Sequence, residues 1–516
     1  MKIIIYIFLL IFTLSPSFAQ NTDQEFVIRE IYFYVEGRTQ DFALMQHGEF
    51  YYGERIQGRD NLYRYIALKT QLLNNQLVLD ASHTRIDYSL DAMEEDGALP
   101  VILMVFVRDS RNFVILPYPE YSTNSGFGLT LKARNYNFLG TMTPMSIDLG
   151  YRRNNEGNHS FNFAFDMSMP FRAGGLNWNL IFGNSILYEP NNPLRFNTSV
   201  GLALNIPWNR TTFGFGATQF LYINNPVSSD SQSFYGVSGS HYSPYFGTEL
   251  FGFWTIPLGL EIGEYGMLSY TFRLAFRANY PIIPTDLTLK PTTINTHTIS
   301  FGRINWIGNF QSGMSFNLSL MNTFYIDNHE APFGTAIDTR LIYHQPIANH
   351  FSLSARLTFR QWWRHSDRTG TWVGISNAGD MLRGIPDNYM TATQMFSFSL
   401  DFAIRILRFT PSIWFNAPSL SLFNVDVHLA PFTDIALLTG TYRNQDGTWS
   451  GVSFSPSEVK QTIGLEMIIF SGYFRSLSLR ASLGYDVERL RREGLRLMGG
   501  FFPRWHEIYI GLERSY

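Results

Sequence analysis

From about Asn112 to Tyr516 the chain is a succession of runs in which apolar and polar residues alternate, each ended by Gly, Asn, Pro or Ser. In the run 396–405 the even positions are Phe, Leu or Ile, whereas the odd positions are Ser, Asp, Ala and Arg. Successive side chains of a strand point to opposite faces, so a period of two is typical of β-strands. The pattern predicts a mainly β protein built of many antiparallel strands.

Two architectures give this alternation, a soluble sandwich and a membrane barrel. A sandwich turns its polar face to water and is usually rich in Lys and Glu there, but here that face carries Ser, Thr, Asn and Gly, and only Lys290 and Lys460 follow Lys132. Many runs reach the ~9–11 residues that cross a bilayer as a tilted strand, with Trp or Tyr near their ends. We therefore expect a transmembrane antiparallel β-barrel of about 16 strands over residues 115–516.

The end of the chain also fits a barrel. Ile508, Ile510 and Leu512 alternate with polar or small residues, and Tyr516 closes the chain with an aromatic ring. An open sheet edge in lipid leaves backbone groups unpaired, so the last strand must pair with the first, which we expect at Phe127–Asn135. The predicted barrel seam thus includes Phe127, Gly511 and Tyr516. Because Gly511 weakens a strand interior, we expect this seam to be short or strained.

Residues 25–110 have a different pattern, which predicts one small α+β domain with the order β-α-α-β-β. Ile28, Ile31, Phe33 and Val35 indicate a first strand, and a short helix is expected at 41–46. Asp60 is a candidate N-cap for a second helix whose apolar positions have helical spacing. Two strands, at 84–90 and 100–108, are joined by an acidic turn at 94–97.

The first twenty residues are typical of a signal peptide. Lys2 provides a positive start, residues 3–14 are almost wholly apolar, and Ser17-Phe18-Ala19 offers a small-residue cleavage site. Twelve apolar residues are fewer than the ~20 that a membrane helix needs. No later segment is apolar enough for such a helix, so a membrane-spanning form of this chain must use strands.

Composition and motifs exclude several classes of function. The chain has no cysteine, which excludes disulfides and thiolate metal sites, and its net charge of −3 gives no case for nucleic-acid binding. The 11 histidines are scattered, and no Gly-x-Ser-x-Gly sequence is present. We therefore expect no enzyme activity, no metal and no cofactor.

Several motifs, in order along the chain, resemble one family. These are Val35-Glu36-Gly37-Arg38-Thr39, the junction Pro117–Asn124 leading to Asn135–Gly140, the loop Met381-Leu382-Arg383-Gly384-Ile385, Ser399-Leu400-Asp401-Phe402, and Phe432-Thr433-Asp434-Ile435-Ala436. Together they are similar to the BamA/TamA-type outer-membrane surface-antigen superfamily, in which a polypeptide-transport-associated (POTRA) domain precedes the barrel. Ile385 replaces the usual aromatic residue of the loop, and Ala436 replaces a glycine.

The resemblance implies a role for the loop Leu382, Arg383 and Gly384. In such proteins it folds into the barrel, where its arginine meets acidic residues, here Asp401 and Asp434. Arginine suits this task because its planar fork grips carboxylates bidentately. Gly384 would permit a tight turn.

The resemblance also implies a location and a function. The barrel would lie in the outer membrane with residues 25–110 in the periplasm, and would assist insertion or folding of outer-membrane proteins, or translocation of polypeptides or lipids. Its partners would be the lipid bilayer, unfolded outer-membrane or secreted polypeptide clients, and periplasmic or inner-membrane accessory proteins. A passive channel, or an exporter dedicated to one secreted partner, remains an alternative.

Overall fold

The computed structural model describes residues 24–514 except 77, 93–96, 111, 124, 191, 209–210, 225–236, 239–243, 283–287, 327–332, 365–381, 386–389, 444–448, 472–476 and 494–505. The predicted signal peptide, the core of the acidic turn and Tyr516 therefore lie outside the described residues. The chain divides into two compact units, one up to Asn112 together with Leu139–Met142, the other containing the remaining residues from Phe113 onward.

The first unit is a small α+β domain. Its elements are β1 (Glu25–Glu36), α2 (Asp41–His47), β2 (Arg55–Gln57), α3 (Arg59–Asn74), β3 (Arg85–Leu90) and β4 (Leu99–Arg108), with the sheet order β2-β1-β4-β3. The short edge strand β2 was not predicted. The prediction of Asp60 as N-cap was wrong: Gly58 precedes the helix with a φ of 84°, and Asp60 lies in the first turn. None of the described helices is long and apolar enough to cross a membrane.

A β-bulge resolves an irregularity in the apolar pattern of β1. The register with the parallel strand β4 shifts between Ile28 and Glu30, so Ile28 and Ile31 both enter the core, with 0% and 7% of their surface exposed. One extra residue in a strand reverses the faces of all residues beyond it. That is why the apolar positions change from even to odd along β1.

Asp109 organises the turn that follows β1. Its carboxylate accepts hydrogen bonds from the Arg38 backbone N–H (2.7 Å) and from Thr39 Oγ1 (2.5 Å). A Cβ at Gly37 would lie 2.2 Å from Asp109 Cγ, so only glycine leaves room for this carboxylate. The Glu-Gly-x-Thr sequence thus binds the carboxylate of Asp109, which lies 70 residues after Thr39 in the chain.

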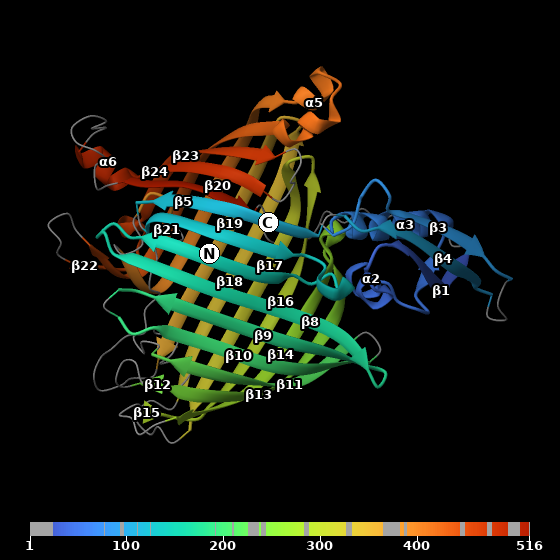
Figure 1. The fold of residues 1–516 in the computed structure, drawn as a ribbon, viewed down its shortest axis with the longest axis horizontal. Helices are drawn as coiled ribbons and strands as arrows, with labels where there is room; N and C mark the ends of the chain where they lie inside the picture. The colour runs from blue at the N-terminus through green and yellow to red at the C-terminus, as the bar shows by residue number, and fades with distance from the viewer. Residues whose placement is uncertain are drawn as a thin grey trace. The chain divides into compact units, whose positions relative to one another are not determined.

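The second unit is a closed antiparallel barrel (Figure 1). Its wall consists of β5 (Phe113–Ser122), β6 (Gly126–Asn135), β7 (Met145–Arg153), β8 (His159–Ala173), β9 (Leu176–Tyr188), β10 (Arg195–Trp208), β11 (Thr211–Ile223), β13 (Tyr245–Glu261), β14 (Met267–Pro281), β16 (Thr292–Ile307), β17 (Phe310–Tyr325), β18 (Phe333–Ala348), β19 (Phe351–Arg364), β20 (Met390–Phe409), β21 (Val425–Arg443), β23 (Lys460–Ser471), β24 (Leu477–Asp486) and β25 (His506–Arg514). The short β22 (Trp449–Val452) pairs with the end of β21, and β12 (Val237–Ser238) pairs with β15 (Thr288–Leu289) apart from the wall.

The wall therefore has 18 strands among the described residues, not the predicted 16. The length of the barrel region bounds the number of strands only when the lengths of the turns and loops are known. Several hairpins here are joined by only two residues, for example Gly174–Gly175 between β8 and β9, which leaves more of the chain for strands. An even number is what a closed antiparallel barrel formed by successive hairpins requires.

The alternation along the strands separates an apolar outside from a polar lumen. On β6, Phe127, Leu129 and Leu131 are each more than 40% exposed, on the face opposite Lys132 and Arg134. Ion pairs line the lumen, among them Arg134 with Asp148, and Arg360 with Asp338. An apolar exterior with a polar interior is the arrangement of a barrel surrounded by lipid, and the reverse of a soluble sandwich.

The two ends of the barrel differ in their connections. At the end where β5 begins, most turns are short, such as 308–309 and 349–350, whereas at the other end the connections 224–244, 365–389 and 487–505 are long. One exception at the short-turn end is 410–424, which contains α5 (Pro411–Trp414) and η5 (Pro418–Phe423). Short periplasmic turns and long outer loops are the usual arrangement in outer-membrane barrels.

Candidate functional site: the arginine loop and the barrel seam

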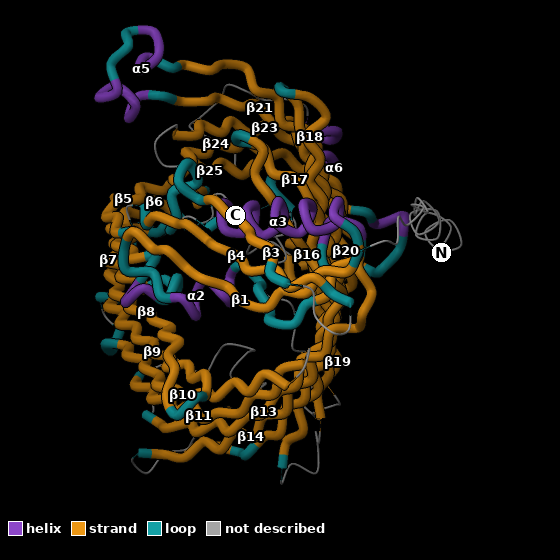
Figure 2. Tube along the Cα trace, turned by 90° about the vertical axis from the view of Figure 1, so that its right-hand side faces the viewer, coloured by secondary structure: helices purple, strands orange, loops and turns teal. Residues whose placement is uncertain are grey.

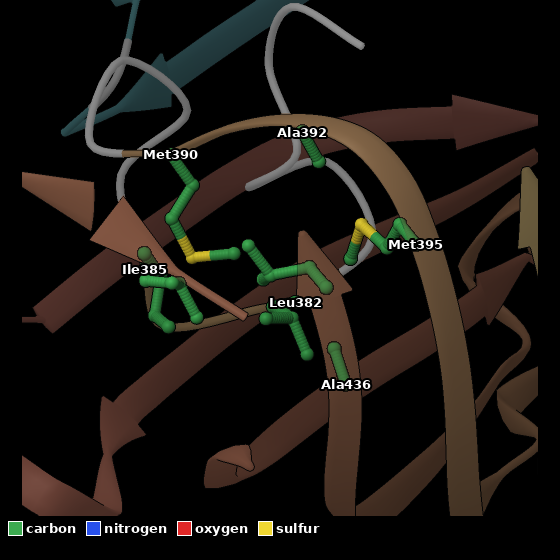
Figure 3. Close-up of a cluster of buried hydrophobic side chains, with 8 residues drawn as sticks. Leu382, Ile385, Met390, Ala392, Met395 and Ala436 are labelled. Carbon is green, nitrogen blue, oxygen red and sulfur yellow. The ribbon is translucent and has the colours of Figure 1, made fainter. Parts of the chain in front are cut away.

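In the connection between β19 and β20, the described residues Leu382–Ile385 pack against the strands that follow. Figure 3 shows Leu382 and Ile385 pointing towards Met390, Met395 and Ala436. Leu382, Met390, Met395 and Ala436 are fully buried, and Ile385 is 1% exposed. This apolar cluster, which also contains Ala392, Leu438 and Val452, fixes both sides of Arg383.

The structure brings Arg383 together with both predicted acidic partners. Its Nη1 donates to Asp401 (2.5 Å), while its backbone N (2.9 Å), Nε (3.1 Å) and Nη2 (2.7 Å) all donate to Asp434. The Asp434 side chain is completely buried, whereas Asp401 is 27% exposed. Asp434 is therefore the principal partner, because a buried carboxylate depends entirely on its protein donors.

Two further contacts of Arg383 were missed by the sequence analysis. Glu466 on β23 approaches Arg383 Nη1 at 3.6 Å and also forms an ion pair with Arg480. The guanidinium lies 3.8 Å above the ring centroid of Phe432, where a cation is attracted to the ring face. The sequence pattern could have indicated that Glu466 is a charged residue on the inward face of its strand. It does not indicate which inward-facing charged residues are neighbours.

A contact between two glycines holds the tip of the loop. Gly384 has a φ of 104°, and a Cβ there would lie 2.6 Å from the backbone of Gly484 and Tyr485. Reciprocally, a Cβ at Gly484 would lie 2.7 Å from Gly384. The loop therefore touches β24 backbone to backbone, which explains a glycine in a strand interior that alternation alone would leave without a role.

The two residues that differ from the motif the sequence resembles, Ile385 and Ala436, lie in the same cluster. Ile385 packs there in place of an aromatic ring, and Ala436 fills with its methyl group a position where a glycine leaves space. Both side chains are buried. Both side chains therefore contribute to the packed apolar cluster beside Arg383.

The barrel closes between β25 and β5, not between β25 and the predicted strand Phe127–Asn135. Phe127 lies on β6, the second strand, opposite Tyr121. The prediction was wrong because most of the expected junction Pro117–Asn124 belongs to the first strand, β5. Proline is tolerated on a strand whose N–H side has no partner. Tyr516, the third predicted seam residue, lies outside the described part of the chain.

This seam is short. Among the described residues, β25 pairs with β5 only through Tyr509↔Ser122, Ile510↔Tyr121 and Gly511↔Glu120, whereas it pairs with β24 through nine residue pairs. The Thr123 N–H adds a bond of 3.0 Å to the Ile508 carbonyl. Gly511 does not cause the shortness, since it keeps its pair and makes room for the Tyr509 ring, whose hydroxyl would lie 2.4 Å from a Cβ there.

The prolines of β5 explain where the ladder stops. Backbone N–H groups alternate between the two neighbouring strands, so the bond from Thr123 to β25 means that all odd residues of β5 face β25. Pro117 and Pro119 are odd and have no N–H to donate. The seam therefore ends immediately beyond Glu120, while the even residues complete a full ladder with β6.

The site thus consists of a charge-locked loop inside the barrel and a weak junction in its wall. Among the described residues, no group of three or more His, Cys, Asp or Glu side chains is arranged to hold a metal ion.

No protein-family model and no curated protein sequence matches this chain. Solved structures similar to it include CdiB from Acinetobacter baumannii, with a TM-score of 0.48, 11% identity and coverage of 95% of this chain and 74% of that one. BamA from Haemophilus ducreyi lacking POTRA domains 1–3 gives a TM-score of 0.42 at 12% identity, covering 94% and 84%. CdiB from Escherichia coli gives 0.39 at 9% identity, covering 97% and 93%.

Proposed function

We propose that this chain is an outer-membrane protein of the BamA-type superfamily that inserts, folds or translocates polypeptide clients by opening the seam between β5 and β25. The observation that carries the proposal is the three-pair seam ending at Pro119. Each backbone hydrogen bond stabilises a strand pairing by about 0.5–1.5 kcal/mol. Separating the three residue pairs of the seam therefore costs far less free energy than separating the nine pairs between β25 and β24.

The proposed mechanism is strand addition. When the seam opens, β25 exposes a row of backbone donors and acceptors, and an extended client can pair with it largely regardless of client sequence. The Arg383 lock lies across β20, β21 and β23, so this part of the wall stays closed while the seam yields. In this mechanism the strands joined by Arg383 stay rigid while the seam between β5 and β25 moves.

The proposal places the barrel in the outer membrane and the N-terminal unit in the periplasm as a POTRA-like domain. The exposed apolar side chains of the barrel and its short turns at the end where β5 begins support this orientation. In the N-terminal unit, β3 forms an edge of the sheet. An edge strand can receive an extended client before it reaches the seam.

The test is a reversible lock across the seam. Ser122 and Tyr509 face each other in a non-hydrogen-bonded pair, where Cα atoms are about 4.5 Å apart, within the range that a disulfide spans. The double variant Ser122→Cys/Tyr509→Cys should form a disulfide, remain a folded barrel, and lose client-folding activity in liposomes until it is reduced. The chain has no native cysteine, so no other thiol interferes.

The matched control locks the other side of the same strand. Leu483→Cys/Ile508→Cys joins β24 to β25, which should stay paired during opening, so this disulfide should leave activity intact. Full activity of the oxidised seam variant would reject lateral opening. If that variant also kept steady ion conductance, a passive channel would be the better account.

A further inference from the structure

The connection between β20 and β21 is unusual for its end of the barrel. Residues 410–424 join these strands, whereas the neighbouring turns at the same end, 349–350 and 308–309, have two residues each. Turns at this end need only reverse the chain. A longer, structured connection indicates an additional contact.

The tip of this hairpin is apolar and exposed. Ile413, Trp414, Phe415 and Phe423, here called the apolar tip, have 73%, 59%, 70% and 62% of their surface exposed. No residue from Phe409 to Asn424 is charged. A cluster of four large apolar side chains without a neighbouring charge is costly in water.

The hairpin is folded in spite of this exposure. Trp414 packs edge-on against Phe409, with ring centroids 5.0 Å apart, and Asn424 Oδ1 accepts a hydrogen bond from Ser412 Oγ at 3.0 Å. Pro411 begins the short helix. The apolar tip is therefore presented by a defined scaffold.

The position of the hairpin indicates what covers the apolar tip. In Figure 2, which looks into the ring of barrel strands, the segment around α5 lies outside that ring. Ile406 and Leu407, on β20 just before the hairpin, are 55% and 53% exposed. The apolar tip thus continues the exposed apolar surface of the barrel wall. The nearest charged side chains, Arg408 and Asp426, pair with each other at 3.3 Å at the base of the hairpin.

We propose that the apolar tip inserts into the periplasm-facing leaflet of the bilayer, at the boundary between headgroups and acyl chains. This inference rests on the membrane location given under Proposed function. Lipid fits better than a protein partner because the tip offers no charge for specific recognition and is continuous with the barrel's apolar surface. Trp and Phe are the side chains that favour this depth. The hairpin would then anchor the barrel beside its wall.

Fluorescence quenching of a single labelled cysteine tests the insertion. Phe415→Cys carrying a bimane label should lose emission in phosphatidylcholine vesicles that contain brominated phosphatidylcholine, and should resist iodide in the buffer. Leu274→Cys, at the middle of β14 and 46% exposed, is the control for a position facing lipid. Tyr52→Cys, 61% exposed in the N-terminal unit, is the control for water. Ile413→Cys repeats the measurement if Phe415→Cys does not fold.

The outcomes separate the two proposals. Quenching at residue 415 by iodide and not by brominated lipid, with normal lipid quenching at residue 274, would overturn the insertion and leave the membrane barrel standing. Protection of residue 415 from both quenchers would mean that protein covers the tip, and would equally overturn it. Absence of lipid quenching at residue 274 would overturn the membrane location and this inference with it.

Discussion

At the residue scale, Arg383 joins the segment Leu382–Ile385 to two carboxylates of the barrel wall. Arg383→Ala removes the two side-chain hydrogen bonds that Asp434 accepts and leaves only the one from the backbone N–H of residue 383. Losing one partner of a buried pair costs on the order of 3–5 kcal/mol, less where the lumen admits water. We expect lower yield and weaker heat resistance of the folded barrel on gels. Asp434→Asn should cost more than Asp401→Asn, since Asp401 is partly exposed. Strictly additive losses in the double variant Arg383→Ala/Asp401→Asn would mean that the two side chains do not interact.

The glycine contact gives a second prediction at this scale. Gly384→Ala or Gly484→Ala forces a methyl group within 2.6–2.7 Å of opposing backbone, and should destabilise the folded barrel by about 1–3 kcal/mol. Gly252→Ala on β13 is the matched control, because its nearest neighbour would be 3.7 Å away. Thermal unfolding followed by gel mobility measures the difference. Equal stability of all three variants would contradict the docked position of the loop.

At the element scale, the prolines of β5 set the length of the seam. The double variant Pro117→Ala/Pro119→Ala adds two N–H groups that face β25. Each new hydrogen bond should stabilise the closed seam by about 1 kcal/mol, which shifts the opening equilibrium roughly fivefold per bond. We expect a more heat-resistant barrel with reduced client-folding activity. Pro431→Ala, on the interior strand β21, is the control and should leave activity unchanged. Undiminished activity of the seam variant would show that opening does not limit function.

The edge strand β3 gives a prediction for client capture. The Asp91 N–H bonds to the Pro100 carbonyl of β4, so by alternation the N–H of Tyr88 faces the open edge. Tyr88→Pro removes that donor, whereas Tyr88→Ala removes the same ring and keeps it. We expect weaker binding of an unfolded client peptide for the proline variant alone, measured by fluorescence anisotropy. Equal affinity of the two variants would place client binding elsewhere.

At the scale of the whole molecule, the two ends of the barrel and the N-terminal unit have a predicted sidedness. Glu156→Cys lies in a turn at the end opposite the start of β5, and should react with a membrane-impermeant maleimide on intact cells. Tyr52→Cys in the N-terminal unit should react only after the outer membrane is permeabilised. The reverse pattern would invert the proposed orientation.

The sequence by itself determined the features that depend on local order. Alternation with a period of two identified the strands of the barrel and predicted which face is apolar, because side-chain direction follows from position along a strand. The residues Leu382–Gly384, Asp401 and Asp434 were found through their resemblance to a family's motifs in the same order, and the structure places Arg383 in contact with both carboxylates. The length of the barrel region bounded the number of strands without fixing it.

Only the tertiary structure decided which strands and side chains are neighbours. Whether proline ends a strand or marks its free side depends on the neighbouring strand, so β5 became recognisable as the first strand only once β25 lay beside it. Glu466 and Gly484 likewise have partners far away in the sequence. Glu466 meets Arg383, and Gly484 contacts Gly384. Local propensity fixes the direction of a side chain, but its partner is set by register and closure, which are properties of the whole sheet.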